Sequence, residues 1–528
     1  MTRDALVFDV IVIGAGHNGL VAAAMAARAG LRVKVVEAQA RLGGAVRTEA
    51  PFVRAPDLRT STGAYLLGLM PPELVAELGL SIPLLRRDPH YFLPTTGKAH
   101  LLLGSDRART RGQLLSFFSE RDLAAHDALS REIAAIRDDV APTWLEEPES
   151  IEATAERYVR PALRGAFVDL CRKPIRDYLS RFGFESELLQ AMYAVTDGFS
   201  GLSATWDMPG TGMNFLVHNM CRLPGSDGTW MIVRGGMGVI TEELARVARA
   251  HGADIETSAP ARHITSRGGA VESVVLEDGR ELWARAVVVG TDPFRMRDMI
   301  GRSALPADYN ARLDAYVRPG MTMKVNLALS ALPRFTCLPD PVGQHRTTIH
   351  LLPEDDVLGE LVRAFREARD GKLPERPTIE WYIHTAVDPS LQDVQGRHSS
   401  ALFVQWVPNE IQGSSWDAEE ARYVDHLLSI CDRFAPGTSG LVVDRFTLHP
   451  KRIEEYFGMT HGHIHHVDNS FGFDERLPVE TPVAGVFSAS AACHPAGSVI
   501  GAAGYIAAKR VLRELSVPGP STPYDRSR

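Results

Sequence analysis

The feature that most constrains this chain is a short apolar strand that runs into a glycine-rich turn near the start of the sequence. Residues 10–13 are β-branched and are followed by glycine, which predicts a buried parallel strand. The next glycines, Gly14, Gly16 and Gly19, have the spacing of a dinucleotide-binding turn. The first permits a tight bend, the second lets the backbone approach a pyrophosphate, and the third lets a helix pack on the strand.

The residues after the turn complete a strand–helix–strand unit. Residues 20–29 are rich in alanine and predict a helix whose N-terminus directs free N–H groups at phosphates. Residues 33–36 predict a second strand, and Glu37 follows it directly, where it can accept hydrogen bonds from ribose hydroxyls. Because these parts occur in this order, we favour a dinucleotide site over a glycine-rich turn of some other α/β domain.

A second glycine turn lies close behind this acid. Arg41 and Leu42 precede the pair Gly43 and Gly44, and a long bound dinucleotide would explain why the backbone must be approached again beyond the pyrophosphate. With these residues the chain resembles the phytoene-dehydrogenase-like branch of the amine-oxidase flavoprotein superfamily, whose extended FAD signature has this form. Amine oxidases usually place an arginine after the glycine pair, whereas this chain has Ala45, as carotenoid-type members tend to.

The resemblance spans nearly the whole chain and implies where FAD binds. Residues 63–72 resemble the segment that passes beside the flavin, and the strand that begins near Ala261 resembles the one over the adenine. Residues 485–504 predict a strand, a glycine-rich turn and a helix, and they resemble the family's C-terminal flavin signature, whose helix start would stabilise reduced flavin. The residues expected to bind FAD are Gly14, Gly16, Gly19, Glu37, Arg41, Gly43, Gly44, Ala64, Ala261, His494, Ser498, Val499 and Ile500.

Length and composition bound the class of protein. A chain of 528 residues is too long for one core and indicates two domains, and a formal charge of −8 offers no basic surface for nucleic acid. The five cysteines are scattered without a C-x-x-C pair, which predicts reduced thiols in a cytoplasmic protein. No segment has the composition of a signal peptide or the length to cross a bilayer, which leaves peripheral membrane contact open.

These observations predict an α/β fold of the amine-oxidase/phytoene-desaturase type. A discontinuous, Rossmann-like FAD-binding domain is expected beside a mixed α+β substrate-binding domain. The expected boundaries are 1–73, 226–300 and 480–515 for the FAD-binding domain, 74–225 and 301–479 for the substrate-binding domain, and 516–528 for a disordered tail.

One lysine is a candidate catalytic residue. Residues 321–330 alternate like a strand, and Lys324 points either into or out of the second domain. It is either a surface lysine on a half-exposed strand or, as the resemblance implies, the family lysine that contacts the flavin N5 edge through water. A partly desolvated lysine there could tune flavin reoxidation or assist proton movement. The sequence leaves both interpretations open.

The histidine-rich tract at residues 461–468 is the most unusual stretch of the chain. If it is a strand, its period of two places His461, His463 and His465 on one face. Histidine clusters bind zinc or copper, but no thiolate or obvious acid completes this one, so no metal is expected. The tract is interpreted as a polar wall of the substrate cavity, with His465 and His466 as candidate catalytic members, or else as structural histidines.

The resemblance implies an FAD-dependent oxidoreductase that moves hydride from an apolar or amphipathic substrate to flavin N5, as in desaturation of a C–C bond. No second nicotinamide fingerprint follows the first turn, so dioxygen or a quinone is the expected electron acceptor. Two alternatives remain. One is a flavin amine oxidase that acts on a C–N bond, and the other is a non-catalytic binding protein on the same fold, as in the GDP-dissociation inhibitors of small GTPases.

Overall fold

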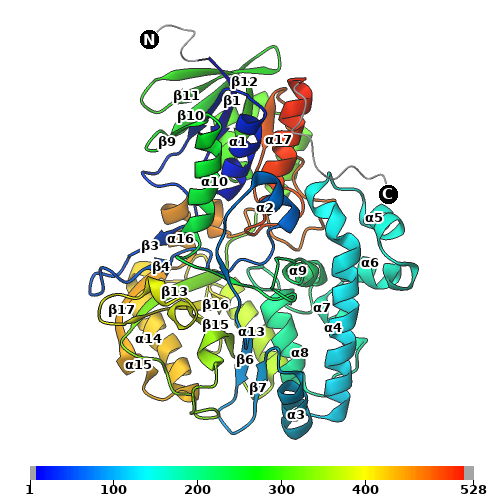
Figure 1. Ribbon diagram of the computed structural model, residues 1–528, viewed down its shortest axis with the longest axis vertical. Helices are drawn as coiled ribbons and strands as arrows, with labels where there is room; N and C mark the ends of the chain where they lie inside the picture. The colour runs from blue at the N-terminus through cyan, green and yellow to red at the C-terminus, as the bar shows by residue number, and fades with distance from the viewer. Residues whose placement is uncertain (1–6, 517–528) are drawn as a thin grey trace.

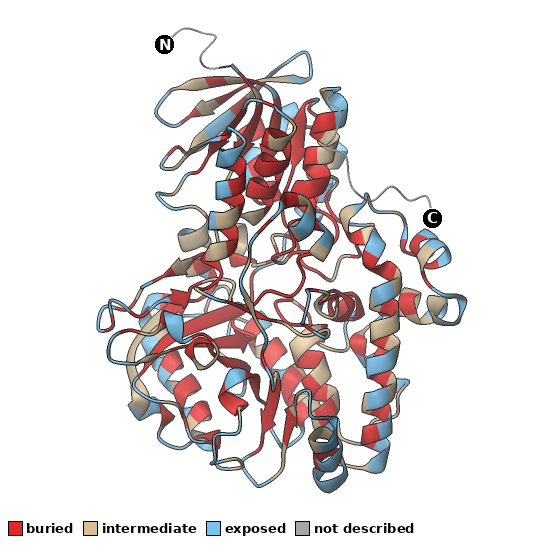
Figure 2. Cartoon of the chain, viewed as in Figure 1, coloured by how far each residue is buried: buried red, intermediate tan, exposed pale blue. Residues whose placement is uncertain are grey.

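Two seven-stranded sheets organise the computed structural model, which describes residues 7–516 (Figure 1). The first sheet lies in the upper part of Figure 1 with α1, α10 and α17, and the second lies in the lower part beside α14. Figure 2 shows that the central strands of both sheets and the inner faces of these helices are buried, whereas the edge strands β9 and β10 of the first sheet are largely exposed or half-buried. The tail predicted from residue 516 lies, apart from Ser516 itself, outside the described residues.

The first sheet has the strand order β10-β11-β12-β1-β2-β9, with β18 paired to β12. β1 runs parallel to β2 and β12, and β18 runs parallel to β12, so their carboxyl ends meet at one edge. The strands come from three separate stretches of the chain, which confirms the predicted discontinuous α/β fold, whereas the exact domain boundaries stay a prediction. The strands are β1 Val7–Ile13, β2 Val33–Val36, β9 Asp254–Glu256, β10 Ala261–Arg267, β11 Ala270–Leu276, β12 Glu281–Val289 and β18 Val486–Ser488.

Helices cover both faces of this sheet because successive side chains of β1 point in opposite directions. Val10 and Val12 pack with α1 (His17–Arg28), α10 (Gly238–Ala250) and α17 (Ala502–Glu514). Ile11 and Ile13 pack on the opposite side with α11 (Pro293–Ile300) and α12 (Ala307–Ala315). The alternation therefore places the sheet between two helical layers.

Two glycines let the helices approach closely. A Cβ atom built at Gly19 would lie 2.1 Å from the carbonyl oxygen of Gly14, and one built at Gly504 would lie 2.0 Å from the carbonyl oxygen of Asn18. Real atoms cannot approach this closely. Only glycine at position 19 therefore lets α1 pack on its own turn, and only glycine at position 504 lets α17 pack on α1. The packing role predicted for the third glycine of the turn agrees with this geometry.

A buried lysine joins β2 to β9. The ammonium of Lys34 lies 2.7 Å from Asp254 and 2.6 Å from Glu256, and Arg280 lies 2.7 Å from Glu256. The hydrogen bond from Arg280 and then that from Lys34 lower the pKa of Glu256 to about 2.

The variant Glu256→Gln should lower the free energy of unfolding at pH 7 by about 1 kcal/mol, as for other partly exposed ion pairs. Because the folded pKa lies below the ordinary 4.5, the stabilisation is present above pH 4.5 and is lost as the pH falls toward 2. Urea unfolding between pH 7 and pH 3 should show the wild-type and variant stabilities converge at low pH. A constant difference would contradict this account.

The second sheet has the order β17-β13-β16-β15-β14-β6-β7, in which only β14 and β6 run parallel. One of its faces is apolar and packs on α14 (Trp416–Phe434). Its strands are β6 Tyr91–Pro94, β7 His100–Leu103, β13 Thr322–Leu329, β14 Thr348–Leu351, β15 Thr378–Ile383, β16 His398–Gln405 and β17 Val442–Leu448. Two short ribbons, β3 Thr48–Glu49 with β4 Thr60–Ser61 and β5 Leu84–Leu85 with β8 Ile232–Val233, join the halves.

A helical layer lies to the right of the second sheet in Figure 1. Within it, Ser119 caps the long helix α4 by accepting from the backbone of Asp122. A π-helical turn, Ala194–Gly198, follows α8 and leads toward the centre of the molecule. The other helices of the chain are α2 Pro72–Leu78, α3 Arg107–Phe117, α4 Glu120–Val140, α5 Ile151–Tyr158, α6 Arg164–Arg172, α7 Ile175–Ser180, α8 Glu187–Tyr193, α9 Thr211–His218, α13 Val357–Arg369, α15 Thr438–Leu441 and α16 Pro450–Phe457.

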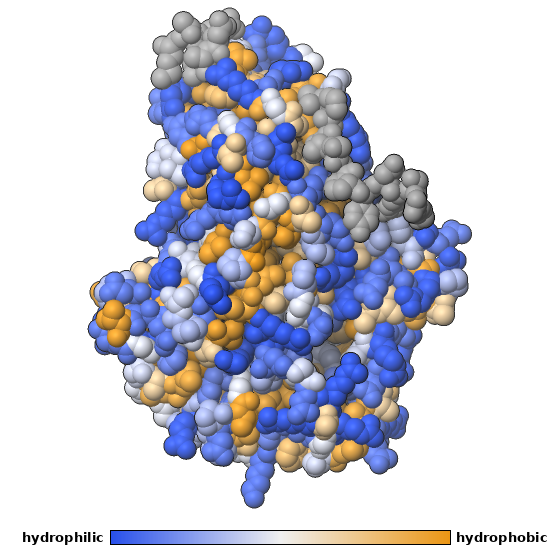
Figure 3. All heavy atoms as spheres, viewed as in Figure 1, coloured by the Kyte–Doolittle hydropathy of each residue, from blue (hydrophilic) through white to orange (hydrophobic). Residues whose placement is uncertain are grey.

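The surface is mostly hydrophilic, with apolar atoms gathered in a central strip of the face shown in Figure 3. Among the exposed large apolar side chains of the described part, Leu115 and Phe117 share α3, whereas others, such as Val53 and Val394, stand singly in loops. Among residues 7–516, every helix is too short or too polar to cross a bilayer.

Candidate cofactor and substrate site

A cavity of about 660 Å³ lies where the first sheet meets the second. Ile13, Val36 and Gly290, at the carboxyl ends of β1, β2 and β12, line one side of it. Lys324 and Phe403 of the second sheet line the other. Ligands of open parallel sheets bind at this edge, so the position agrees with a dinucleotide site.

The wall beside the first glycine turn is built to admit a phosphate. A Cβ atom built at Gly16 would meet no other atom within 4 Å, so it would project into the cavity. Gly16 also caps α1 without a side chain, which leaves the first N–H groups of the helix free for an anion. The second turn lies against the first, since the N–H of Gly43 donates to the carbonyl of Ala15 at 2.9 Å. These residues fit a bound dinucleotide.

Glu37 is held rigidly at the end of β2. One carboxylate oxygen accepts from the N–H of Ala15 and the other from the N–H of Gln39, each at 2.8 Å. The side chain is buried yet reaches the cavity wall. Its place beside the glycine turn suits recognition of a ribose.

The structure brings most of the predicted cofactor residues together. Those that line the cavity are Gly14, Gly16, Glu37, Gly43, Gly44, Ala64, Ala261, Ser498 and Val499. Gly19, Arg41, His494 and Ile500 are not cavity-lining residues.

These four residues have other surroundings. Gly19 packs against the glycine turn, and Ile500 belongs to an apolar core. The Arg41 side chain is 69% exposed and lies 3.6 Å from Glu49, so solvent and this carboxylate hold it away from the cavity. His494 is buried, and its Nε2 lies 3.1 Å from the carbonyl oxygen of Thr143. The roles predicted for Arg41 and His494 at the cofactor would need them to move.

Lys324 faces the cavity, so the interpretation of it as a surface lysine is wrong. All eight residues of β13 are buried because helices and loops cover both faces of the second sheet. The ammonium donates to the carbonyl of Ser61 at 2.5 Å and to that of Gly63 at 2.7 Å, and it lies 4.4 Å from the centre of the Tyr65 ring. Burial lowers the pKa of Lys324 well below its ordinary value.

The polar face of the second sheet continues from Lys324 as a row of cross-strand neighbours. Phe403 lies beside Lys324, Glu380 lies beside Phe403, and His350 lies beside Glu380. The buried carboxylate of Glu380 accepts from Tyr382 and, at 3.3 Å, from the hydroxyl of Ser200, which lines the cavity.

None of Glu380, Phe403 and His350 was predicted from the sequence, although the sequence contains one signal for this row. The alternation of residues 378–383 places Glu380 and Tyr382 on one face of a strand and apolar residues on the other. An acid on such a strand is unusual enough to be a candidate.

Aromatic side chains dominate the far end of the cavity. Tyr65, Trp230 and Phe403 line it together with Ser200 and His218. They come from five separate stretches of the chain, so no local motif could have assembled them. His218 ends α9, and its Nδ1 lies 3.0 Å from the carbonyl oxygen of Thr196 in the π-helical turn.

The histidine-rich tract is a loop and not a strand, so the expected single face does not exist. His461 and His466 have positive φ angles of 61°, which breaks any extended run. Within residues 7–516, no group of three or more His, Cys, Asp or Glu side chains is arranged to hold a metal ion.

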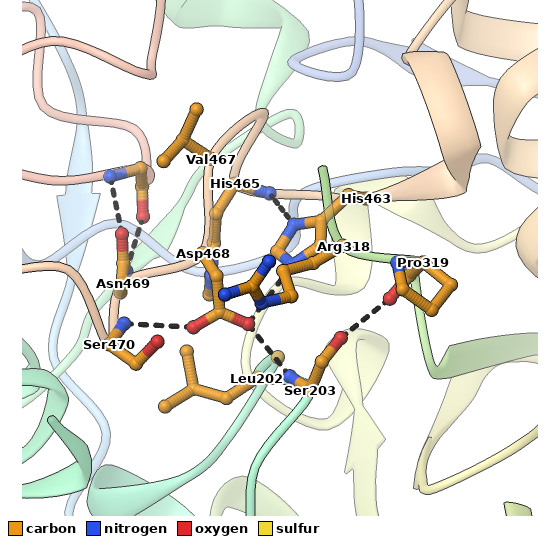
Figure 4. A network of polar contacts seen from close by, with 12 residues as sticks. Leu202, Ser203, Arg318, Pro319, His463, His465, Val467, Asp468, Asn469 and Ser470 are labelled. Carbon is orange, nitrogen blue, oxygen red and sulfur yellow. Dashed lines mark hydrogen bonds and ion pairs between the residues drawn. The ribbon is translucent and has the colours of Figure 1, made fainter. Parts of the chain in front are cut away.

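A carboxylate organises this loop (Figure 4). Asp468 lies 3.2 Å from Nε2 of His463 and accepts 2.8 Å hydrogen bonds from the N–H groups of Ser203 and Ser470. Nδ1 of His463 accepts in turn from the N–H of His465 at 3.3 Å. Burial alone would raise the pKa of Asp468, but these hydrogen bonds hold it well below its ordinary value.

The variant Asp468→Asn should lower the free energy of unfolding by about 1–3 kcal/mol, because either orientation of the amide turns an N–H toward a backbone N–H. Urea unfolding at pH 7 measures the loss. Ser470→Ala is the matched control, since only the backbone of Ser470 contacts the carboxylate. Equal stability of the two variants would show that the carboxylate does not hold the loop.

The two predicted catalytic histidines point to different parts of the cavity. His465 packs on Gly201, where a built Cβ would lie 2.5 Å from its Cε1, and its buried Nδ1 has no hydrogen-bond partner among the described residues. His466 lies on the side of the glycine turn, with its Nδ1 2.9 Å from the hydroxyl of Ser490. Burial, and then His463, lower the pKa of His465 well below its ordinary value.

Comparison with known proteins identifies the family. A family model described as flavin containing amine oxidoreductase matches residues 19–335, which is more than half of the chain. The chain belongs to the flavin-containing amine oxidoreductase family. Members of this family bind FAD, so this protein is an FAD-dependent oxidoreductase, as the resemblance implied.

Individual relatives and a solved structure show how similar this chain is to other proteins. Pyridine nucleotide-disulfide oxidoreductase domain-containing protein 2 of Rattus norvegicus is 33% identical over 96% of this chain and 94% of its own. Hydroxyneurosporene desaturase of Rhodobacter capsulatus is 28% identical over 70% of this chain and 71% of its own. A putrescine oxidase solved with putrescine superposes with a TM-score of 0.61 at 17% identity, covering 97% of this chain and 100% of that one, which shows a shared fold.

Proposed function

We propose that this flavoprotein removes hydride from an apolar or amphipathic substrate and desaturates a C–C bond. The observation that carries the proposal is the wall of the far end of the cavity, where Tyr65, Trp230 and Phe403 meet neutral polar groups. The carboxylates that line the cavity lie elsewhere, directly after β2, on and beside α11, and on α16. An apolar substrate suits this surface, whereas the cation of an amine would find no lining carboxylate to pair with there.

The chain's own residues would orient the substrate and receive a proton. Bound flavin supplies the acceptor for the hydride and its electron pair. The proton lost from the neighbouring carbon requires a base, and His465 has a buried Nδ1 without a hydrogen-bond partner within residues 7–516. Because burial keeps this imidazole neutral, it can accept that proton. Lys324, fixed by two carbonyl groups, would hold the polar edge of the cofactor.

A relative supports the substrate class. Hydroxyneurosporene desaturase, which shares the family, is named for C–C desaturation of a carotenoid. Dioxygen or a quinone is proposed as the electron acceptor, because the chain has a single dinucleotide turn of this type.

A visible spectrum of the purified protein, followed by anaerobic titration, tests the proposal. Flavin absorbance should bleach on addition of a carotene or a cyclic terpene and should recover with air or a quinone. Bleaching by amines alone would replace the proposal with amine oxidation, the alternative suggested by the shared fold of putrescine oxidase. Bound flavin that no substrate class reduces would favour a binding protein.

A further inference from the structure

Two histidines flank the glycine turn on the cavity wall. His17 is the first residue of α1 and follows Gly16 directly, and His466 lies on the facing loop. Both line the cavity, and they are close enough for the charge of His466 to lower the pKa of His17. Both therefore line the part of the cavity beside the glycine turn, where the geometry admits a pyrophosphate.

Each imidazole has an atom available to a ligand. The Nε2 of His17 is buried and has no hydrogen-bond partner among the described residues. In His466 the hydroxyl of Ser490 engages Nδ1, and this hydroxyl also accepts from the N–H of Ala492 at 3.1 Å. When the serine donates its own proton to Nδ1, the proton of a neutral His466 stands on Nε2, where a ligand can accept it.

The cavity wall carries more acidic than basic side chains, so a cationic histidine would matter there. The acidic side chains of the wall are Glu37, Asp292, Asp298 and Glu455, and its lysine and arginine side chains are Lys324 and Arg295. Arg295 already lies 3.6 Å from Asp292, and Lys324 lies on the second sheet, away from the turn. A pyrophosphate would add two negative charges to a wall in which acids outnumber bases, so a further cation beside the turn would stabilise it.

The free protein keeps both imidazoles neutral near pH 7. Burial, and then His466, lower the pKa of His17 to about 4, although the backbone of Ser498 opposes the change. Burial also lowers the pKa of His466, which Asp292 raises in part and His463, Arg476 and Arg295 lower further. An anion placed between two such groups favours their charged forms.

We propose that His17 and His466 form a clamp for the pyrophosphate of FAD and that the cofactor binds together with a proton. His466 donates from Nε2, and His17 donates once it has gained the proton on its free nitrogen. This assigns His466 to the cofactor instead of to the substrate wall. The proposal concerns the cofactor alone and does not rest on the proposed substrate class.

Calorimetric titration of the cofactor-free protein with FAD tests the clamp. In buffers with different ionisation enthalpies at pH 7, binding should take up close to one proton. Across pH 6 to 8 the Kd should rise as the pH rises, by up to tenfold per unit for one linked proton. Riboflavin, which has no phosphate, should bind without proton uptake. A Kd for FAD that does not change with pH, or equal uptake with riboflavin, would overturn the proposal.

The variants are chosen to preserve the backbone. His17→Gln suits a helical position, and His466→Asn suits a residue with φ of 61°, where asparagine is tolerated. Both should weaken FAD binding at least tenfold at pH 6 and should remove most of the proton uptake. His251→Gln, an exposed histidine after α10, is the control and should leave both unchanged. Variants that keep the wild-type pH dependence would overturn the clamp.

A second measurement uses the protein with its FAD bound. Flavin fluorescence on heating reports cofactor release, whose midpoint should fall as the pH rises from 6 to 8 in wild type. The two histidine variants should release flavin at one temperature across this range. A wild-type midpoint that is independent of pH would contradict the proposal even if the cofactor-free protein does not refold.

Discussion

Replacing Gly16 with valine should abolish FAD binding while the fold remains intact. The backbone of Gly16 has an ordinary φ of −71°, and a Cβ built there would meet no protein atom within 4 Å, so the valine side chain would occupy the cavity. The affinity for FAD should fall at least about 100-fold, which corresponds to about 2.7 kcal/mol. Absorbance at the flavin bands after gel filtration, with calorimetric titration, measures this loss.

The neighbouring glycine provides the contrast. Gly19→Ala places a Cβ against the carbonyl of Gly14, so it should lower the free energy of unfolding by about 1–3 kcal/mol, as overpacking does. Urea unfolding of the cofactor-free proteins should therefore separate the variants, with Gly16→Val close to wild type. A yellow Gly16→Val protein with stoichiometric flavin would refute the position of the site.

Replacing Lys324 with methionine should leave FAD bound but should slow reduction or reoxidation of the flavin. Proton transfer by a positioned side chain contributes about 10²-fold or more, so the rate should fall by at least about tenfold even if part of this effect is kept. The lysine is the only Lys side chain that lines the cavity, within the described residues, and it lies beside the Tyr65 ring. Its loss removes the donor to two buried carbonyl groups as well. Anaerobic stopped-flow absorbance measures each half-reaction separately.

A residue on the same strand controls for damage to the sheet. Asn326 lies two positions along β13, is fully buried, and donates to the carbonyl groups of Thr62 and Phe446 without lining the cavity. Asn326→Leu should lower stability but should leave both flavin half-reactions at wild-type rates. If Lys324→Met also leaves both rates unchanged, the lysine is structural.

The features that could be predicted from the sequence are those formed by residues that are consecutive in the chain. The strand, turn and helix around Gly16 form one continuous stretch whose spacing is set by the ligand. The positions predicted for them therefore agree with the structure. The helix after Gly501 was predicted for the same reason. Both motifs place the cofactor end of the cavity without any knowledge of long-range contacts.

The substrate end depends on contacts between distant parts of the chain. Glu380 reaches the cavity only through Ser200, and the burial of Lys324 depends on which elements cover β13. Alternation along a strand gives two faces but does not say what packs on each. The histidine-rich tract would have one face only as a strand, and its spacing did not reveal that it forms a loop in which Asp468 contacts His463.

The first sheet combines elements from the two ends of the chain, which affects how the protein folds during its synthesis. β1 and α1 emerge early from the ribosome, whereas β18 and α17, which pack beside them, emerge near the end. At typical speeds of synthesis the interval is on the order of a minute. Throughout it, the apolar surface of α1 lacks α17, and β12 lacks β18 from its own synthesis onward, so chaperones can bind both surfaces. Flavin colour in cells therefore reports chains whose translation has passed Val499, since shorter products lack the wall formed by Ser498 and Val499.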